Sequence, residues 1–129
     1  MGEHIRKKRI ESGQTQKEVA TLIGVDEESI FAWEKGTSTP MVHNYPLIIA
    51  YLGYYPLDHE TESIGGKLQQ VRYCLGFSCK KTAVILGVDT ATVRRMELGK
   101  RALVKKVHNP IQTMWFELPA YAKQQYRSE

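Results

Sequence analysis

The sequence predicts an all-α fold built from two tandem units, each with four to five helices. Shifting the 129-residue chain by 63 positions aligns residues 2–36 with residues 65–99 without a gap, and ten of the 35 pairs are identical. Apolar residues in each copy recur at three- and four-residue spacings, as they do on the inner face of an amphipathic helix. Glycines and helix-capping residues separate these stretches. This pattern indicates a duplicated helical unit.

The repeat defines the expected organisation of the chain. The first copy spans residues 1–57, a polar linker covers 58–64, the second and more divergent copy spans 65–118, and 119–129 reads as a short polar tail. The alignment continues past residue 36 with a one-residue insertion, which pairs Pro46 with Pro110. Each copy is therefore expected to end in an aromatic-rich helix that begins at proline, where the missing N–H costs nothing.

The first two helices of copy one follow from local signals. Residues 5–12 can form a basic amphipathic helix that stops at Gly13. Thr15 and Glu18 have the spacing of a capping box, in which each side chain bonds the backbone N–H of the other residue. The second helix should therefore begin at Thr15. It should end at Gly24, because glycine takes the left-handed conformation of a helix C-terminus without strain.

A third helix follows closely after Gly24. Asp26 is a good N-cap, Ile30 and Trp33 lie three residues apart on one face, and Gly36 comes just past the end. Two short helices joined by a tight glycine turn form a helix-turn-helix. Equivalent stations in the second copy are occupied by Ser78, Ala83, Gly87, Val88, Asp89, Val93, Met96 and Gly99.

These residues resemble the Cro and phage-repressor (XRE) family of helix-turn-helix proteins, in two tandem copies. The similarity rests on Gln16, Ala20, Gly24, Ile30 and the run 34–36, with sequence Glu-Lys-Gly. It implies lambda-repressor-like units and an ion pair between the first and third helices of each copy. By position these pairs would be Arg9 with Glu34 and Arg72 with Glu97. The second copy departs from the pattern at Cys79, which replaces the glutamine, and at Thr82.

The resemblance also implies the DNA contacts. In this family the third helix enters the major groove and the start of the second helix grips the backbone. By position, the expected contact residues of copy one are Gln16, Lys17, Glu27, Glu28 and Ala32. Those of copy two are Lys80, Thr90, Ala91, Arg94, Arg95, Lys100 and Arg101. The first set places Gln16 near a phosphate and acidic Glu27 and Glu28 where they could accept from a cytosine amino group, whereas the second set suits guanine, thymine and phosphate.

Other functional classes find little support in the sequence. The formal net charge of +4 is compatible with a polyanionic partner. Nothing approaches a catalytic triad, a phosphate-binding glycine loop or a metal cluster, so no enzymatic activity, cofactor or small-molecule ligand is expected. We expect two reduced thiols at Cys74 and Cys79, and isolated surface histidines at positions 4, 43, 59 and 108. Without a membrane span or a signal peptide, we expect a cytoplasmic protein.

Two functions from different classes remain open. The first is a sequence-specific transcriptional regulator, a repressor, that binds double-stranded DNA through an asymmetric or directly repeated site of some 15–20 base pairs. The second is a protein-interaction module, antitoxin-like or anti-regulator, that holds a partner or a second copy through aromatic side chains. Its candidate faces contain Tyr45, Tyr51, Tyr54, Tyr55, Trp115 and Phe116. The other interpretation of these aromatics is packing within and between the copies.

Overall fold

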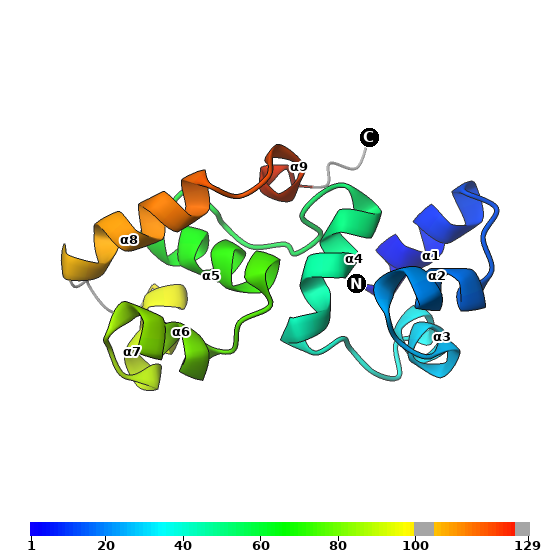
Figure 1. Cartoon of the computed structure of the whole chain (residues 1–129), viewed down its shortest axis with the longest axis horizontal. Coiled ribbons are helices and arrows are strands. Elements are labelled where there is room, and N and C mark those ends of the chain that lie inside the picture. Colours follow the sequence, from blue (N-terminus) through cyan, green and yellow to red (C-terminus); the bar gives the residue numbers. More distant parts are fainter. Residues whose placement is uncertain (100–104, 126–129) are drawn as a thin grey trace.

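The computed structural model describes residues 1–99 and 105–125, and these residues form helices without any extended strand. The all-α prediction is confirmed. The helices of the first half are α1 (Gly2–Glu11), α2 (Gln16–Ile23), α3 (Glu27–Lys35), the 3-10 helix η1 (Val42–Asn44) and α4 (Tyr45–Leu52). The second half contains α5 (Ile64–Leu75), α6 (Cys79–Leu86), α7 (Thr90–Glu97), α8 (Lys105–Phe116) and the short α9 (Ala120–Lys123). Figure 1 shows the two halves side by side along the long axis.

The capping signals of both copies act as expected. Thr15 and Glu18 make both hydrogen bonds of the capping box, and Asp26 caps α3 by accepting from the backbone N–H of Ser29. In the second copy Ser78 and Asp89 cap α6 and α7 in the same way. The turns at Gly24 and Gly87 both have positive φ, 83° and 70°. Each pair of short helices is therefore set by equivalent local chemistry.

Each copy has its own apolar core, and five equivalent positions contribute to both cores. The first contains Ile5, Val19, Ala20, Ile23, Ile30, Trp33, Ile48 and Leu52. The second contains Ile64, Leu68, Ala83, Leu86, Val93, Met96, Val107 and Ile111. A third cluster, which we call the junction, joins the halves: Tyr45, Ile49, Tyr55 and Ala122, with Met1, Leu57, Tyr73 and Cys74 packed against them.

The first glycine of each copy is explained by close helix packing. A Cβ built on Gly2 would overlap the carbonyl oxygen of Trp33, and a Cβ on Gly65 would overlap that of Met96. The first helix of each copy therefore touches the backbone of the third helix. Only glycine allows this approach, which accounts for an identity between the copies that lies outside the turns.

An ion pair links the same two helices in each copy, as the family resemblance implies. The Arg9 guanidinium donates to both carboxylate oxygens of Glu34 at 2.8 Å. Arg72 donates to Glu97 at 2.7 and 2.9 Å. Each arginine also donates 3.2 Å to a backbone carbonyl five residues further on, at Gln14 in one copy and Phe77 in the other. One side chain thus ties the first helix, the third helix and the loop that starts the second helix.

Several expectations about the C-terminal part are wrong. Pro110 lies inside α8 and does not begin it, because α8 starts at Lys105 and extends a full turn before the proline. Ala120–Lys123 of the expected polar tail form α9, and Ala122 is buried in the junction. The tail therefore contributes an apolar contact that its composition conceals. Ile64, assigned to the linker, is the first residue of α5 and lies in the second core.

The histidines at positions 4 and 59 are not isolated surface residues. The Nδ1 atom of His4 lies 2.8 Å from the hydroxyl oxygen of Tyr54, and both side chains are half-buried. The Nε2 atom of His59 lies 2.6 Å from the hydroxyl oxygen of Tyr55, which is fully buried. His43 is exposed, as expected. The two tyrosines thus supply partners that the sequence alone does not place next to these histidines.

Breaking the ion pair of the second copy should destabilise the fold strongly. The side chains of Arg72 and Glu97 are only 10% and 7% exposed, so Glu97→Gln leaves a buried, uncompensated charge. We expect a loss of about 3–5 kcal/mol in the free energy of unfolding, measured by urea denaturation. Replacing both partners by methionine should restore most of the loss, because no buried charge remains. Glu117→Gln, at an exposed site, is the control, and a double variant as unstable as the single one would contradict the explanation.

The stability should also depend on the protonation of His4. Burial, followed by the positive N-terminus, lowers the pKa of His4 below its ordinary 6.5. The folded state therefore favours the neutral ring, so the stabilisation is complete above pH 6.5 and is lost as the pH falls towards the lowered pKa. We expect His4→Gln to make the stability depend less on pH in this range. Thermal denaturation at a series of pH values measures this dependence. His43→Gln serves as the control, and equal slopes in the wild type and the His4 variant would contradict the prediction.

Candidate nucleic-acid interface

The candidate interface of each copy consists of its second and third helices. α2 and α3 in the first copy, and α6 and α7 in the second, are held at their turns by the caps and glycines described above. In Figure 1, α3 and α7 both lie towards the lower edge of the molecule, at opposite ends of its long axis. The two candidate recognition helices are thus separated along the molecule.

The predicted contact residues of the first copy lie on the outer side of α2 and α3. Lys17, Glu27 and Glu28 are exposed, and Ala32 is half-buried. Gln16, expected near a phosphate, is also half-buried, and its side-chain amide donates 3.3 Å to a carboxylate oxygen of Glu34. Gln16 therefore supports the ion pair at the start of α2.

The electrostatics of α3 are acidic. Hydrogen bonds from the side chain and the backbone N–H of Ser29 lower the pKa of the exposed Asp26 carboxyl, which caps α3. Burial opposes ionisation of Glu34, but hydrogen bonds from Arg9 and Gln16 outweigh it and lower the pKa of this carboxyl. Glu27 and Glu28 follow in the first turn of α3. Residues 16–35 contain two basic and five acidic residues, a net charge of −3.

The second copy presents the opposite charge on the same scaffold. Residues 79–98 contain four basic and two acidic residues, a net charge of +2. Arg94 and Arg95 project from α7, Lys80 lies at the start of α6, and Ala91 lies in the first turn of α7; all four are exposed. Thr90 is half-buried, and the predicted contacts Lys100 and Arg101 lie outside the described residues. The structure thus brings the described predicted residues of this copy together on α6 and α7.

Two further lysines, in addition to the predicted contact residues, belong to this basic surface. Lys81 is exposed on α6, with its ammonium group 4.2 Å from the centroid of the Phe77 ring. Lys106, on α8, donates 3.1 Å to the carbonyl oxygen of Gly87, in the turn between α6 and α7. Only the tertiary structure places Lys106 there, because 19 residues separate it from that glycine. Both extend the positive charge around the turn.

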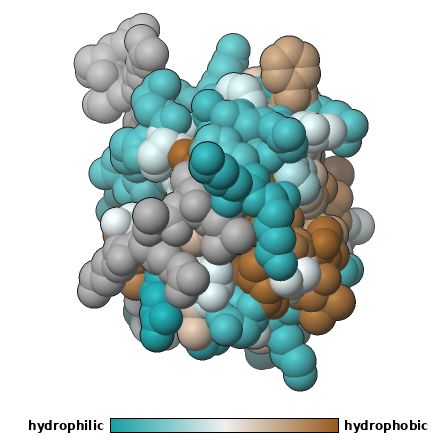
Figure 2. Space-filling view, turned by 90° about the vertical axis from the view of Figure 1, so that its left-hand side faces the viewer, coloured by the Kyte–Doolittle hydropathy of each residue, from teal (hydrophilic) through white to brown (hydrophobic). Residues whose placement is uncertain are grey.

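Exposed apolar side chains accompany both interfaces. In the first copy Leu22 and Phe31 are 56% and 53% exposed, and Phe31 occupies the position equivalent to Arg94. In the second copy Val84 and Leu98 are 77% and 68% exposed. Figure 2, which faces the end that carries α7 and α8, shows a mainly hydrophilic surface with one hydrophobic area. An interaction between proteins would find apolar surface in both copies.

Most of the aromatic side chains considered from the sequence pack inside the protein. Tyr45 and Tyr55 are 6% and 0% exposed and lie in the junction. Tyr51 donates 2.8 Å to the side-chain oxygen of Gln14, and Tyr54 packs against the first core. Phe116 differs from these side chains, since it is 78% exposed. The packing interpretation therefore holds for the tyrosines.

A comparison with protein families found a similarity in the first copy. Residues 5–59 match the helix-turn-helix family model. This family is a DNA-binding regulatory domain without catalytic function. The matched segment of the helix-turn-helix unit contains α2, α3 and the ion pair of Arg9 with Glu34, and it ends before α5. Comparisons with curated proteins and with solved structures gave no match.

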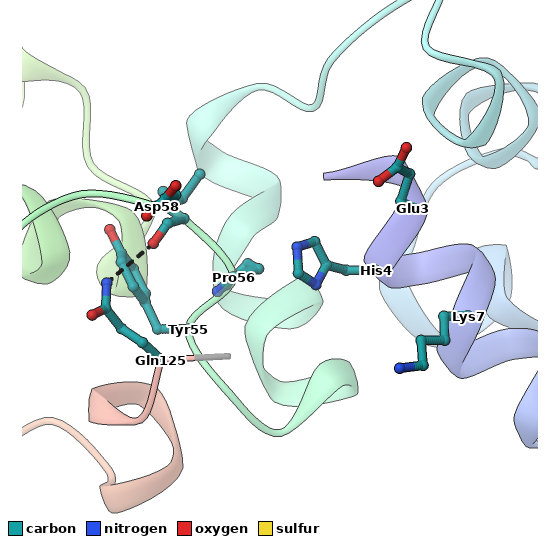
Figure 3. A pocket seen from close by; sticks show the side chains of 8 residues that line it. Glu3, His4, Lys7, Tyr55, Pro56, Asp58 and Gln125 are labelled. Atoms are coloured by element: carbon teal, nitrogen blue, oxygen red, sulfur yellow. Dashed lines mark hydrogen bonds between the residues drawn. The ribbon is translucent and has the colours of Figure 1, made fainter. Parts of the chain in front are cut away.

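Three other kinds of feature were considered in the described part of the chain: a metal site, a membrane span and a cleft. Residues 1–99 and 105–125 contain no group of three His, Cys, Asp or Glu side chains that could hold a metal ion. No helix within the same ranges is long and apolar enough to cross a membrane. A cleft of about 420 Å³ lies between α1 and residues 55–58 (Figure 3). Its lining mixes Glu3 and Asp58 with Lys7 and His4, so it does not select one ligand charge.

Proposed function

We propose that the protein is a sequence-specific transcriptional regulator, a cytoplasmic repressor, with two covalently linked helix-turn-helix units at residues 1–57 and 65–118. In this proposal the second unit reads DNA bases through α7, and the first unit serves mainly as a scaffold that positions the second unit on the DNA. The observation that carries it is the contrast between two equivalent helices. The positions of Phe31 and Ala32 on α3 are occupied by Arg94 and Arg95 on α7.

The chemistry of α7 suits base recognition in the major groove. Arginine donates two hydrogen bonds to guanine, and the methyl groups of alanine and threonine can contact thymine. Arg94, Arg95 and Ala91 are exposed on this helix, while Val93 and Met96 are buried and fix its orientation. Lys80, Lys81 and Lys106 surround it with charges that suit phosphates. A protein seated on a duplex in this way excludes other proteins from the same site, which supports repression.

A second candidate function uses the first unit as a protein-docking module. Leu22 and Phe31 are exposed apolar side chains near Glu27 and Glu28 in the sequence. Such a surface suits a partner with basic and apolar groups. The salt dependence of binding distinguishes the two functions, because phosphate contacts weaken steeply between about 50 and 200 mM salt whereas an apolar interface responds little.

Removing the two arginines of α7 should weaken specific binding strongly. We expect Arg94→Ala with Arg95→Ala to weaken binding to a duplex selected from genomic fragments by about 2 kcal/mol or more, roughly thirtyfold in Kd. Because both side chains are exposed, the free energy of unfolding should change by less than about 0.5 kcal/mol. The matched control is Arg6→Ala with Lys7→Ala, which removes the same charge from α1. Equal affinity of the α7 variant and the wild type would refute DNA reading by α7.

Removing the carboxylates of α3 should strengthen binding. Glu27→Ala with Glu28→Ala relieves repulsion between α3 and the phosphates, so we expect affinity to rise about fivefold at 50 mM salt and less at 200 mM. Titration by fluorescence anisotropy measures the affinity at both salt concentrations. The control, Glu3→Ala with Glu11→Ala, removes the same charge from α1. Weaker and less selective binding of the α3 variant would instead identify Glu27 or Glu28 as a reader of cytosine.

A further inference from the structure

We propose that the junction locks the two units into one rigid head-to-tail pair, so that a single chain recognises a non-palindromic duplex at one fixed spacing between its two contact sites. This inference rests on the proposed DNA-binding function. It adds that the spacing is set by residues remote from either recognition helix, namely the junction and the C-terminal helix α9.

The junction joins non-equivalent helices of the two copies. α4, the fourth helix of the first copy, packs against α5, the first helix of the second. The rings of Tyr45 on α4 and Tyr73 on α5 meet edge to face, with their centroids 4.7 Å apart. A two-fold pair would repeat each contact reciprocally, so α1 would pack against α8 as α5 packs against α4. Within residues 1–99 and 105–125, α1 makes no comparable contact with α8, so the packing is heterologous and the two units are related head to tail. A palindromic site does not match such an arrangement.

Gly76 allows the close approach of the two copies. It ends α5 with a φ of 73°, and a Cβ placed on it would lie 2.9 Å from Cγ of Pro46 and 3.2 Å from Cα of His43. The equivalent Gly13 has a similar φ of 66° but no atom within 4 Å of the same position. Both glycines serve the turn, and only Gly76 also serves the junction.

The two residues that follow α9 fasten the junction from the C-terminal side. The backbone N–H of Tyr55 donates 2.6 Å to the carbonyl oxygen of Gln124. The side-chain amide of Gln125 donates to the carbonyl oxygens of Leu57 and His59 at 3.3 and 2.9 Å, and Figure 3 shows this side chain beside Tyr55. The C-terminal segment therefore holds the chain that connects the two copies.

Gln70 attaches α9 to the second unit. Its side chain is 1% exposed, its Nε2 atom donates 2.9 Å to the carbonyl oxygen of Ala122, and its Oε1 atom accepts at 2.9 Å from the indole N–H of Trp115. A buried amide with a donor and an acceptor both satisfied holds a single orientation. Since Ala122 also packs in the junction, α9 links α5 and α8 to α4.

The interface is not repeated at the outer ends of the pair. The positions of Gln70 and Tyr73 correspond in the first copy to Lys7 and Ile10, both exposed. The positions of Tyr45 and Ile49 correspond in the second copy to Asn109 and Thr113, which are also exposed and polar. The junction therefore depends on residues that distinguish the copies, and a head-to-tail array stops at two units. One chain suffices for the asymmetric site.

Rigidity can be tested on the intact protein without DNA. One alignment tensor should fit the residual dipolar couplings of residues 1–52 and 64–99 in the wild type. Ala122→Glu places a carboxylate in the junction and should separate the two tensors. The matched control, Ala120→Glu, alters the exposed start of α9 and should retain one tensor. Gly76→Ala against Gly13→Ala is a second comparison, since both carry the same backbone strain and only the former collides with Pro46. Two different tensors in the wild type would overturn the inference.

Cys74 gives an independent measure of junction opening. Its Sγ atom lies 3.8 Å from the carbonyl oxygen of Ala122, and burial raises the pKa of its thiol to about 12. Alkylation of Cys74 by iodoacetamide, followed by mass spectrometry with Cys79 as the internal reference, should accelerate at least about tenfold in Ala122→Glu, because the thiolate regains solvent. Ala120→Glu should react as the wild type does. Equal rates in both variants would show that α9 does not close the junction.

Binding to DNA then tests the fixed spacing. Starting from a selected duplex, insertion of five base pairs between the two protected segments turns them to opposite faces of the helix, at about 10.5 base pairs per turn. We expect the wild type and Ala120→Glu to lose at least about tenfold in affinity, and Ala122→Glu to lose less than about threefold. Absence of binding to any duplex would refute the proposed function itself, whereas wild-type binding that tolerates every spacing would refute only this inference.

Discussion

The paired arginine and glutamate that connect the first and third helices support everything else in each copy. Arg9 and Arg72 occupy the same station, and each makes two short bonds to a carboxylate and one to the loop before the next helix. Such a pair stabilises little by itself, because burying two charges costs nearly as much as their attraction returns. The ion pair matters because it fixes the orientation of the helices. The planar guanidinium fixes the angle between helices and so fixes where the recognition helix points.

This shared scaffold allows the two copies to differ on their surfaces. The two cores share five equivalent positions, whereas the exposed positions of α3 and α7 carry opposite charge. Core residues are constrained by close packing, but exposed residues can change with little effect on stability. The family model matches residues 5–59 of the first copy, whereas the proposed function assigns base reading to the second copy, whose α6 and α7 are the more basic. The copy that matches the family model is thus not the copy that we propose to read DNA bases.

The junction fixes the position of one copy relative to the other, which two independent units would not do. Buried tyrosines, a satisfied buried glutamine and a glycine that leaves no room for a Cβ beside a proline give the two copies little freedom. A flexible link raises the local concentration of a second unit, whereas a rigid one also selects the distance between the two contact sites. Selectivity for DNA can therefore reside in residues that never touch it.

The sequence by itself determined the second and third helices of each copy, their caps and the duplication, because these depend on spacing along the chain, whereas the ion pairs were implied by the family resemblance. It placed Thr15, Asp26, Gly24 and their counterparts correctly, since capping and turn chemistry are local. Only the tertiary structure decided the junction, because residues such as Gln70 and Ala122 lie 52 positions apart and carry no periodic signal. It likewise showed that α8 passes through Pro110 and that the expected tail is a packed helix. A short apolar residue in a polar segment becomes part of a core only when a distant surface is there to cover it.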